Sequence, residues 1–313
     1  MPQGGVVGPL LFVIYIDSIS SCVSGQNNLS KIKLFADDAK VYSNDPVSLQ
    51  QSLNEMILWI KDRQLRAAPH KCFSITLQKP KLITPAAADT EYMIMNQNIP
   101  NKCLASDLGI VISNDLKWRH HIDHLYKQAS FCCYQIFKCT RSRNIFTLLQ
   151  LYKTYIRPKL EYCTTVWSPY LVQDISKIES IQRSFTKFAF IRCGIQFDSY
   201  NDRLRKINLK TLEERRLIFD LILVFKIING LSDLHFDDYF IFNTTTYNLR
   251  RHPLQISNVK TNFNNQWQNC FFTRVINIWN MLPENVATAH TFEIFKSRIH
   301  KTCLSKHLRL FMN

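Results

Sequence analysis

The chain contains little glycine, only 7 of its 313 residues. Collagen-like repeats and glycine-rich linkers need far more glycine, so both architectures are excluded. Glycine also supplies many tight turns, and its scarcity shifts the expectation toward helix. Intrinsic disorder is excluded as well, because 46% of the residues are hydrophobic and 12% are aromatic.

Long apolar runs are also missing. Residues 6–16 form the longest apolar stretch near the start, about half of a bilayer-spanning helix, and no basic segment precedes them as in a signal peptide. Residues 217–228 are strongly apolar but contain Asp220 and Lys226, which indicates a buried helix. We therefore expect an intracellular protein, nuclear or cytoplasmic, that is neither secreted nor associated with a membrane.

The ten cysteines include no Cys-x-x-Cys pair. In an intracellular chain this pattern is typical of reduced thiols, and it indicates neither a disulfide framework nor a metal site. His120 and His124 lie one helical turn apart, and Asp123 is adjacent. Because no Cys or carboxylate set completes a tetrahedral zinc site at the right spacing, we expect these histidines on a polar helix face.

Negative charge is scarce, with 24 Asp and Glu against 39 Lys and Arg, a formal net charge of +15. Such an excess needs an anionic partner or counterions, most simply nucleic acid. The cations gather between residues 115 and 159, among aromatic residues; the candidate nucleic-acid contacts are Lys117, Arg119, Lys127, Lys138, Arg141, Arg143, Lys153 and Arg157. The alternative is a solvated helix face with the aromatic residues in the core. A second basic cluster is Arg203, Arg205, Lys206, Lys210, Arg215 and Arg216.

Hydrophobic periodicity predicts mixed structure in the first part of the chain and helix in the rest. The first part contains an apolar helix over 10–19, a strand–turn–strand over 32–43, a helix beginning at Pro46 or Ser48, and short strands at 73–77 and 108–112. Further helices are predicted around 122–136, 148–157 (ended by Pro158), 175–188, 211–229, 272–279 and 292–303. We expect an α+β fold with domains over 1–112, 113–195 and 196–313.

Two adjacent carboxylates, Asp37 and Asp38, fall where the predicted strand turns. They repel each other, and each requires water or a cation. A solvated turn explains an isolated Asp-Asp pair, because Asp is a common turn residue. The alternative is a divalent-metal site, since clustered oxygen ligands suit Mg²⁺.

The neighbouring motifs favour the metal site. A Pro2-Gln3-Gly4 motif lies about thirty residues before Phe35-Ala36-Asp37-Asp38. Further motifs follow in order: Lys71-Cys72 after a helix containing Trp59, Leu108-Gly109-Ile110, Trp118 and His121, Glu161-Tyr162 and Trp167, and Trp279-Asn280 before Leu282-Pro283. This ordered set resembles the reverse transcriptases of LINE-type (non-LTR) retrotransposons, and the resemblance covers nearly the whole chain.

The resemblance implies a partial polymerase palm with a catalytic β-hairpin, a mostly helical thumb and a helical C-terminal region. It implies an RNA-directed DNA polymerase that uses two Mg²⁺ or Mn²⁺ ions. Its partners would be deoxynucleoside triphosphates and a heteroduplex of RNA template and DNA primer, with no membrane. Asp37 and Asp38 would hold the metal ions.

Three further roles follow from the resemblance alone. Lys71 matches a lysine that protonates or neutralises the leaving pyrophosphate, and a solvated surface lysine is the alternative. Gln3 and Gly4 would border the nascent base pair and template. Phe35 and Ala36 are grouped with them, although packing around the hairpin explains these two better.

Departures from the family pattern also shape the expectation. The chain begins inside the Pro-Gln-Gly motif, so the fingers and the palm strand with another catalytic Asp are expected to be missing. Gly5 stands where the family usually has Ser, Ala68 replaces Asn and Asp107 replaces an aromatic residue. We expect a truncated polymerase fragment that is inactive alone. The alternatives are a non-catalytic nucleic-acid-binding protein derived from the element and a translated relic without function.

Overall fold

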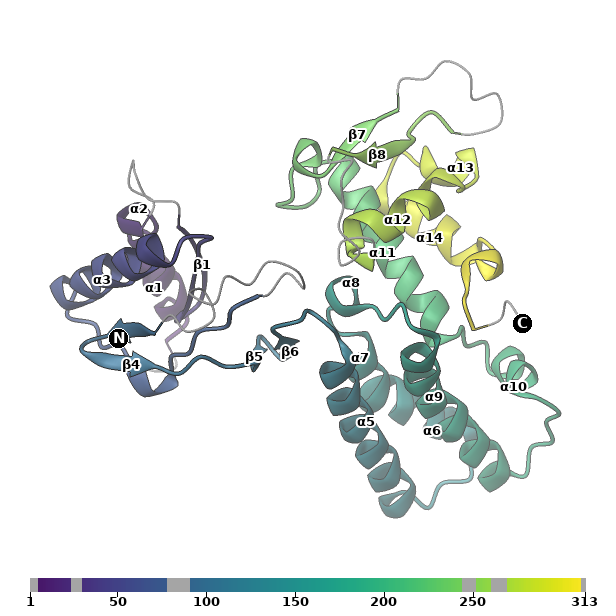
Figure 1. Cartoon of the computed structure of the whole chain (residues 1–313). Helices are drawn as coiled ribbons and strands as arrows, with labels where there is room; N and C mark the ends of the chain where they lie inside the picture. Colours follow the sequence, from purple (N-terminus) through teal and green to yellow (C-terminus); the bar gives the residue numbers. More distant parts are fainter. Residues whose placement is uncertain (1–4, 24–29, 78–90, 244–251, 260–268, 311–313) are drawn as a thin grey trace. The chain divides into compact units, whose positions relative to one another are not determined.

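The computed structural model describes residues 5–23, 30–77, 91–243, 252–259 and 269–310. The chain divides into two compact units, Met1–Lys117 (unit 1) and Trp118–Asn313 (unit 2), which are shown in Figure 1 and described separately below. The predicted domains 113–195 and 196–313 fall almost entirely within unit 2. No helix in the described part of the chain is long and apolar enough to cross a membrane.

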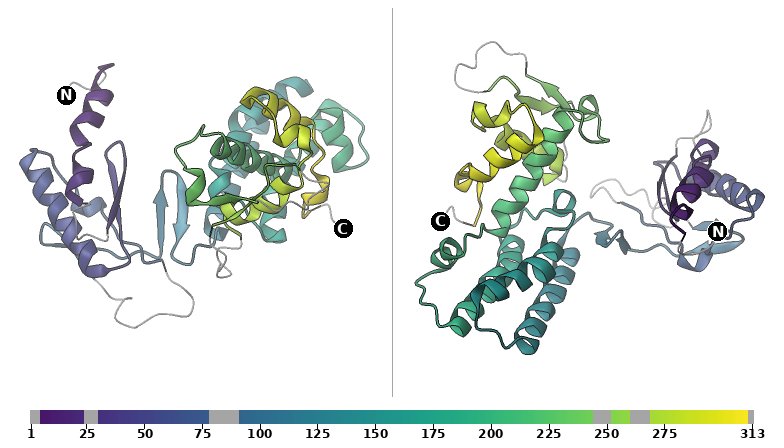
Figure 2. Two further views of the ribbon diagram at one scale, coloured as in Figure 1. Left: turned by 90° about the horizontal axis from the view of Figure 1, so that it is seen from above. Right: turned by 180° about the vertical axis from the view of Figure 1, so that it is seen from behind.

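Unit 1 combines helices with three antiparallel hairpins. Its elements are α1 (Gly8–Ile16), α2 (Ile19–Val23), β1 (Lys31–Phe35), β2 (Asp38–Tyr42), α3 (Pro46–Asp62), a 3-10 turn (Pro69–Lys71), β3 (Tyr92–Ile94), β4 (Gln97–Ile99), β5 (Leu104–Asp107) and β6 (Ile110–Ser113). Each hairpin pairs consecutive strands: β1 with β2, β3 with β4, and β5 with β6. In the left view of Figure 2, α1 (purple) projects from the rest of the unit, and none of its residues is buried.

Helix α3 supports the core of unit 1. Its N-cap is Asp45, whose carboxylate accepts a hydrogen bond from the Ser48 amide at 2.8 Å, and Pro46 follows as the first helical residue. Proline suits this position because its missing N–H has no helical partner there. The buried face of α3 packs with α2 and with the hairpin β3–β4; the buried apolar side chains of this core are Ile19, Val23, Leu53, Met56, Ile57, Trp59, Ile94 and Ile99.

Two predicted elements of unit 1 are wrong. The predicted helix over 10–19 is interrupted, because α1 ends at Ile16 and α2 begins at Ile19. The predicted strand over 73–77 is reduced to an isolated bridge between Ser74 and Asn101. Alternation of apolar residues favours extended backbone, but a strand also needs a partner along its length, and here only Ser74 has one.

Unit 2 is almost entirely helical. Its elements are α5 (Arg119–Cys139), α6 (Ile145–Leu151), a π-helical turn (Tyr152–Ile156), α7 (Arg157–Glu161), α8 (Thr164–Trp167), α9 (Val172–Cys193), α10 (Tyr200–Lys206), α11 (Leu212–Ile228), a 3-10 turn (Phe236–Asp238), β7 (Phe240–Phe242), β8 (Ile256–Asn258), α12 (Phe271–Asn280), α13 (Glu284–Ala287), α14 (Phe292–Lys301) and a 3-10 turn (Ser305–His307). Strands β7 and β8 form an antiparallel hairpin.

The helix predicted to end before Pro158 does not end there. The chain passes from α6 through the π-helical turn into α7, in which Pro158 is the second residue. A proline cannot donate a backbone hydrogen bond, but the first turn of a helix does not require one. The wider π turn changes the hydrogen-bond register just before the proline, so the helical path continues.

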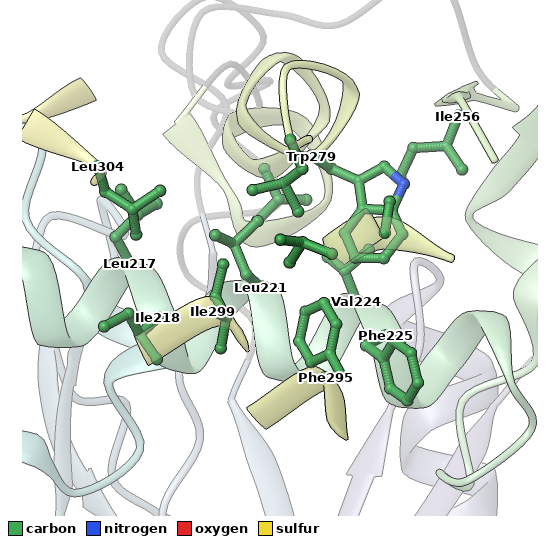
Figure 3. Packing of buried hydrophobic residues seen from close by; sticks show 14 of the residues in the cluster. Leu217, Ile218, Leu221, Val224, Phe225, Ile256, Trp279, Phe295, Ile299 and Leu304 are labelled. Carbon is green, nitrogen blue, oxygen red and sulfur yellow. The ribbon is translucent and has the colours of Figure 1, made fainter. Parts of the chain in front are cut away.

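Helix α11 forms the centre of unit 2 and contacts α7, α8, α9, α12 and α14. Thr211 caps it by accepting a hydrogen bond from the Glu214 amide, and Gly230 follows it with a φ of +66° that favours glycine. Figure 3 shows Leu221, Val224 and Phe225 of α11 packed against side chains of α12 and α14. Rings of Phe225 and Phe295 stack with centroids 4.3 Å apart.

Charged side chains join α11 to α7, α9 and α12. Glu161 of α7 pairs with Arg215, and Asp220 pairs with Arg274 of α12 through two bonds of 2.9 Å. The buried carboxylate of Glu179 in α9 accepts a hydrogen bond from the Leu212 amide at the start of α11, at 2.9 Å. Burial raises the pKa of Glu179. The contacts of Glu161 and Glu179 connect residues on both sides of the predicted boundary at 195–196.

Candidate functional site

The hairpin β1–β2 presents the two candidate metal-binding carboxylates. Phe35 pairs with Asp38, which leaves Ala36 and Asp37 as a two-residue turn. Ala36 has a φ of +50°, a left-handed conformation that costs free energy for a residue with a Cβ. The apolar face of the hairpin packs on the core of unit 1 through Ile32, Leu34 and Val41. Packing on one face fixes the register and therefore places Asp37 and Asp38 at the tip.

Both carboxylates are exposed to solvent. Their oxygen atoms are the ligands that Mg²⁺ and Mn²⁺ favour, so the donor chemistry fits a divalent cation. Among the residues that the structure describes, however, no three His, Cys, Asp or Glu side chains come together to hold a metal ion. Within the described residues, the hairpin tip thus presents two neighbouring carboxylates without a full set of metal ligands.

One face of the hairpin is polar. Because side chains alternate along a strand, the residues on the face of Asp38 are Lys31, Lys33, Phe35, Lys40 and Tyr42. Lys33 and Lys40 lie directly opposite each other, and their like charges repel. The Asp107 carboxylate of β5 relieves this repulsion through an ion pair with Lys40, at 2.6 Å. Lys40 and Asp107 were not among the sequence candidates; alternation points to Lys40, but no sequence signal pairs it with residue 107.

Phe35 is 60% exposed at the end of β1, so it does not pack in the core. It offers an aromatic ring beside the two carboxylates. The expectation that Phe35 serves packing around the hairpin is therefore wrong. Ala36 is also exposed and forms the first turn residue. The candidates Gln3 and Gly4 lie outside the described residues.

Lys71 closes the short turn Pro69–Lys71, and its side chain is exposed. Its amide donates a hydrogen bond to the Ala68 carbonyl at 2.9 Å, so the backbone of this turn is fixed. In the described part of the chain, the structure records no ion pair between Lys71 and Asp37 or Asp38.

The eight candidate nucleic-acid contacts lie in different local environments. Lys117 is the last residue of unit 1 and pairs with Asp115 at 3.2 Å. Arg157 is mostly buried and lies 3.8 Å from Glu161. Arg119 and Lys127 are exposed on α5, and Lys153 is half-buried in the π-helical turn. The remaining three, Lys138, Arg141 and Arg143, lie together around a groove between α5 and α9.

This groove has a volume of about 1270 Å³ and is lined by residues of α5, α9 and the segment after α5. Arg192 of α9, which the sequence candidates did not include, adds a fourth cation. Its guanidinium donates a 2.8 Å hydrogen bond to the Phe137 carbonyl and lies over the Phe137 ring at 4.9 Å. Burial raises the pKa of Cys133, another lining residue, to about 12, so its thiol is neutral at physiological pH.

The second basic cluster is divided between buried and exposed side chains, and Arg205, for example, is 80% exposed. Arg203 and Arg216 are 4% and 2% exposed. Arg203 lies over the Phe197 ring at 4.6 Å and donates to Thr186. Arg215, Lys206 and Lys210 are paired with carboxylates, and their partners are Glu161, Asp202 and Glu214. The charge pattern along the sequence did not reveal these partners.

Comparisons with known proteins relate the first part of the chain to a polymerase family. Residues 1–103 match the family model of reverse transcriptase (RNA-dependent DNA polymerase). This stretch contains the hairpin with Asp37 and Asp38 and ends just before β5. Reverse transcriptases act on a nucleic-acid template and nucleotide substrates, and the family generally uses divalent metal ions.

A curated relative gives a second similarity. The chain is 29% identical over 133 residues to uncharacterized protein B0403.1 of Caenorhabditis elegans. The aligned stretch covers 42% of this chain and 66% of that protein, just under two thirds of its length. No solved structure matches the chain.

Proposed function

We propose that the chain is an RNA-directed DNA polymerase of the non-LTR (LINE) retrotransposon type. In this proposal residues 1–112 form a partial palm, residues 113–195 a helical thumb-like domain and residues 196–313 a helical C-terminal region. One observation carries it: a two-residue β-turn presents Asp37 and Asp38 to solvent within the stretch that matches reverse transcriptases.

The hairpin contributes in three ways. Asp37 and Asp38 would hold Mg²⁺ or Mn²⁺ at the tip. When bound, the ions would activate the primer 3′-hydroxyl and stabilise the negative charge of the departing pyrophosphate. Lys31 and Lys33 place positive charge on the face of Asp38, where phosphate groups of the nucleotide or the primer would be attracted. Lys71 would neutralise the pyrophosphate from its turn.

Binding of the template–primer heteroduplex follows from the charge of the chain. A net charge of +15 favours a polyanion, and each phosphate contact releases counterions. Arg119 and Lys127 are exposed along α5, the first helix of unit 2. A helix that carries exposed cations can bind a duplex through its backbone without reading its sequence.

A non-catalytic nucleic-acid-binding protein derived from such an element is the second candidate. The observation that favours it is the count of metal ligands. Two-metal catalysis needs carboxylates on more than one side of the ions. Among the described residues no three His, Cys, Asp or Glu side chains come together to hold a metal ion, and the Asp107 carboxylate beside the hairpin is paired with Lys40. We therefore expect this chain alone to extend a primer weakly or not at all.

The first test measures metal binding without relying on activity. Fe²⁺ substituted for Mg²⁺ generates hydroxyl radicals that cut the backbone near the bound ion. We expect cuts around residues 36–39 in the full chain, their suppression by excess Mg²⁺, and their loss in Asp37→Ala. Asp62→Ala is the matched control, because Asp62 is an 80% exposed carboxylate on α3 of the same unit. Unchanged cutting in Asp37→Ala would contradict a metal site at the hairpin.

The second test is primer extension on poly(rA) primed with oligo(dT), with heteroduplex binding measured in parallel. Extension that disappears in Asp37→Ala would establish catalysis by this chain and overturn the expectation of weak activity. Salt-sensitive heteroduplex binding without extension or metal-dependent cutting would select the non-catalytic binding protein. Failure to bind heteroduplex at low salt would contradict both candidates.

A further inference from the structure

The groove between α5 and α9 combines exposed aromatic rings with unpaired cations. The two helices lie side by side in unit 2 (Figure 1) and contact each other along their length. Tyr134 of α5 and Phe188 of α9 line the groove, and each is 57% exposed. Phe137 lies between them and the core, with its ring centroid 6.0 Å from that of Phe188. The groove thus has an aromatic wall on each side and an aromatic base.

The charges along the groove all have one sign. Lys138, Arg141 and Arg143 line it, and none of the described lining residues is acidic. Within the described part of the chain, Arg141 and Arg143 are exposed and have no ion-pair partner. The Lys138 ammonium lies over the Tyr134 ring at 5.5 Å, which places positive charge directly beside an exposed aromatic face. An occupant of this groove therefore carries negative charge and planar apolar groups.

Shape decides which polyanion fits. The groove has a volume of about 1270 Å³, larger than the roughly 300 to 1,000 Å³ of a typical small-molecule pocket. A segment of a polymer fills such a volume better than a small molecule does. A double helix keeps its bases stacked and paired inside, so it cannot offer base faces to Tyr134 or Phe188. A single strand exposes both its bases and its phosphates. Stacking platforms flanked by cations are the general arrangement that binds single strands.

We infer that the α5–α9 groove binds single-stranded nucleic acid, with unpaired bases against Tyr134 and Phe188 and phosphates against Arg141 and Arg143. The inference rests on the proposed function only in taking nucleic acid as the ligand. It assigns a site for an unpaired strand, distinct from duplex binding along α5. Arg192 keeps the groove in shape, because its guanidinium joins α9 to the carbonyl groups at the end of α5.

The test compares matched aromatic variants in the full chain. Fluorescence anisotropy with labelled oligo(U) measures the Kd of Tyr134→Ala, Phe188→Ala and the control Phe131→Ala. Phe131 is 60% exposed on the same helix as Tyr134 and does not line the groove. We expect each groove variant to bind at least about fivefold more weakly, because loss of one stacked base costs that much or more. Phe188→Tyr keeps an aromatic face, and its affinity stays near that of the natural chain.

The cations are tested through the salt dependence of binding. Removing two phosphate contacts in Arg141→Gln/Arg143→Gln lowers the slope of log K against log salt by about 1.4 for a single strand. Lys187→Gln is the control, because Lys187 is exposed on α9 outside the groove. An oligonucleotide with 2-aminopurine reports stacking directly: its fluorescence falls on binding to the natural chain and stays high with Phe188→Ala.

The outcomes separate this inference from the proposed function. Equal weakening by Phe131→Ala and Phe188→Ala, or no weakening by either, overturns the inference whatever the polymerase assays show. A concentration-dependent dimer that Phe188→Ala dissociates assigns the groove to a second copy and also overturns it. Loss of single-strand binding in the groove variants alone supports it, even where Asp37→Ala leaves metal-dependent cutting unchanged and the polymerase proposal fails.

Discussion

In unit 1 the helix α1 buries none of its nine residues, whereas in unit 2 the helix α11 buries nine of its seventeen. Among the residues that the structure describes, the apolar cores differ in the same direction: eight buried side chains form the core around α3, and nineteen form the core around α11. The match to a family model follows the opposite order. The family match lies in residues 1–103, within the unit that has the smaller core.

This contrast separates two kinds of sequence information. A metal-binding hairpin needs particular side chains at particular positions, because oxygen ligands such as carboxylates must lie where the divalent cation binds. A core accepts many combinations of hydrophobic side chains of suitable volume. Unit 1 can therefore be recognised from a few residues such as Asp37 and Asp38, whereas the family match does not extend into unit 2. Its function must be sought in surface chemistry such as the α5–α9 groove.

The largest expected effect comes from a substitution that disrupts the packing of unit 2 alone. Trp279 is fully buried in the core of α11, α12 and α14 (Figure 3), and its indole N–H donates to the Leu254 carbonyl at 2.7 Å. Trp279→Ala should lower the free energy of unfolding of unit 2 by about 3 to 5 kcal/mol. Hydrogen exchange followed by mass spectrometry measures both units in one sample and should show no change in unit 1.

Met281→Ala is the control for this prediction, because Met281 is 60% exposed at the end of the same helix. Its effect should stay within about 0.5 kcal/mol. Equal loss of protection in unit 1 and unit 2 after Trp279→Ala would contradict their independence as compact units.

The second prediction concerns the charges that join the helices of unit 2. Asp220→Ala leaves the Arg274 guanidinium mostly buried without its carboxylate, and we expect a loss of about 3 kcal/mol. The double variant Asp220→Leu/Arg274→Met removes both charges and should recover most of that loss. Urea denaturation of the three chains measures the differences. If the double variant were no more stable than Asp220→Ala, the loss would come from the missing ion pair between α11 and α12. It would then not come from the unpaired charge of Arg274.

Local patterns predicted the elements that depend on local physics. Alternation gave the hairpin strands around Asp37 and Asp38, and the helical period gave α3, α5, α9, α11, α12 and α14. Capping chemistry was also predictable, since Pro46 begins α3 and Gly230 follows α11. In each case the deciding interactions lie within a few residues along the chain.

The sequence did not predict features that depend on partners far along the chain. The turn from α6 into α7 at Pro158 is one, because it depends on packing of Tyr152 and Ile156, which are fully buried. The burial of Arg216 is another, since Arg usually lies at the surface. The groove cation Arg192 lies 55 residues beyond its hydrogen-bond partner Phe137. Charge counted along the sequence cannot distinguish such paired or buried cations from free ones.

The third prediction concerns how the stability of unit 2 depends on pH. His121 is 1% exposed in unit 2, with its ring against Trp167 at 5.1 Å, and burial lowers its pKa to about 4. Between pH 6.5 and 4 the unfolded chain binds a proton at this residue and the folded chain does not. The stability of unit 2 therefore falls as the pH falls through this range, by about 2 to 3 kcal/mol at pH 4.5 relative to pH 7.5.

His121→Phe removes this titration, so the difference in stability between the two pH values should shrink by that amount. Chemical denaturation at pH 7.5 and 4.5, monitored by a spectroscopic probe in unit 2, measures this difference in stability. The exposed neighbour His120 is the control, and His120→Gln should leave the difference unchanged. A His121→Phe chain with the same acid sensitivity as the natural protein would show that other groups dominate the loss.

The smallest expected effect concerns α1, the exposed helix of unit 1. Leu10 and Ile14 are 62% and 64% exposed, so their side chains contribute little burial to the folded unit. Leu10→Gln/Ile14→Gln should therefore change the stability of unit 1 by no more than about 0.5 kcal/mol per substitution. In contrast, Ile19→Ala at the 2% exposed start of α2 should cost about 2 kcal/mol or more. Hydrogen exchange of α3 reports both effects, and a large loss of protection from the α1 variant would show that α1 packs on unit 1 after all.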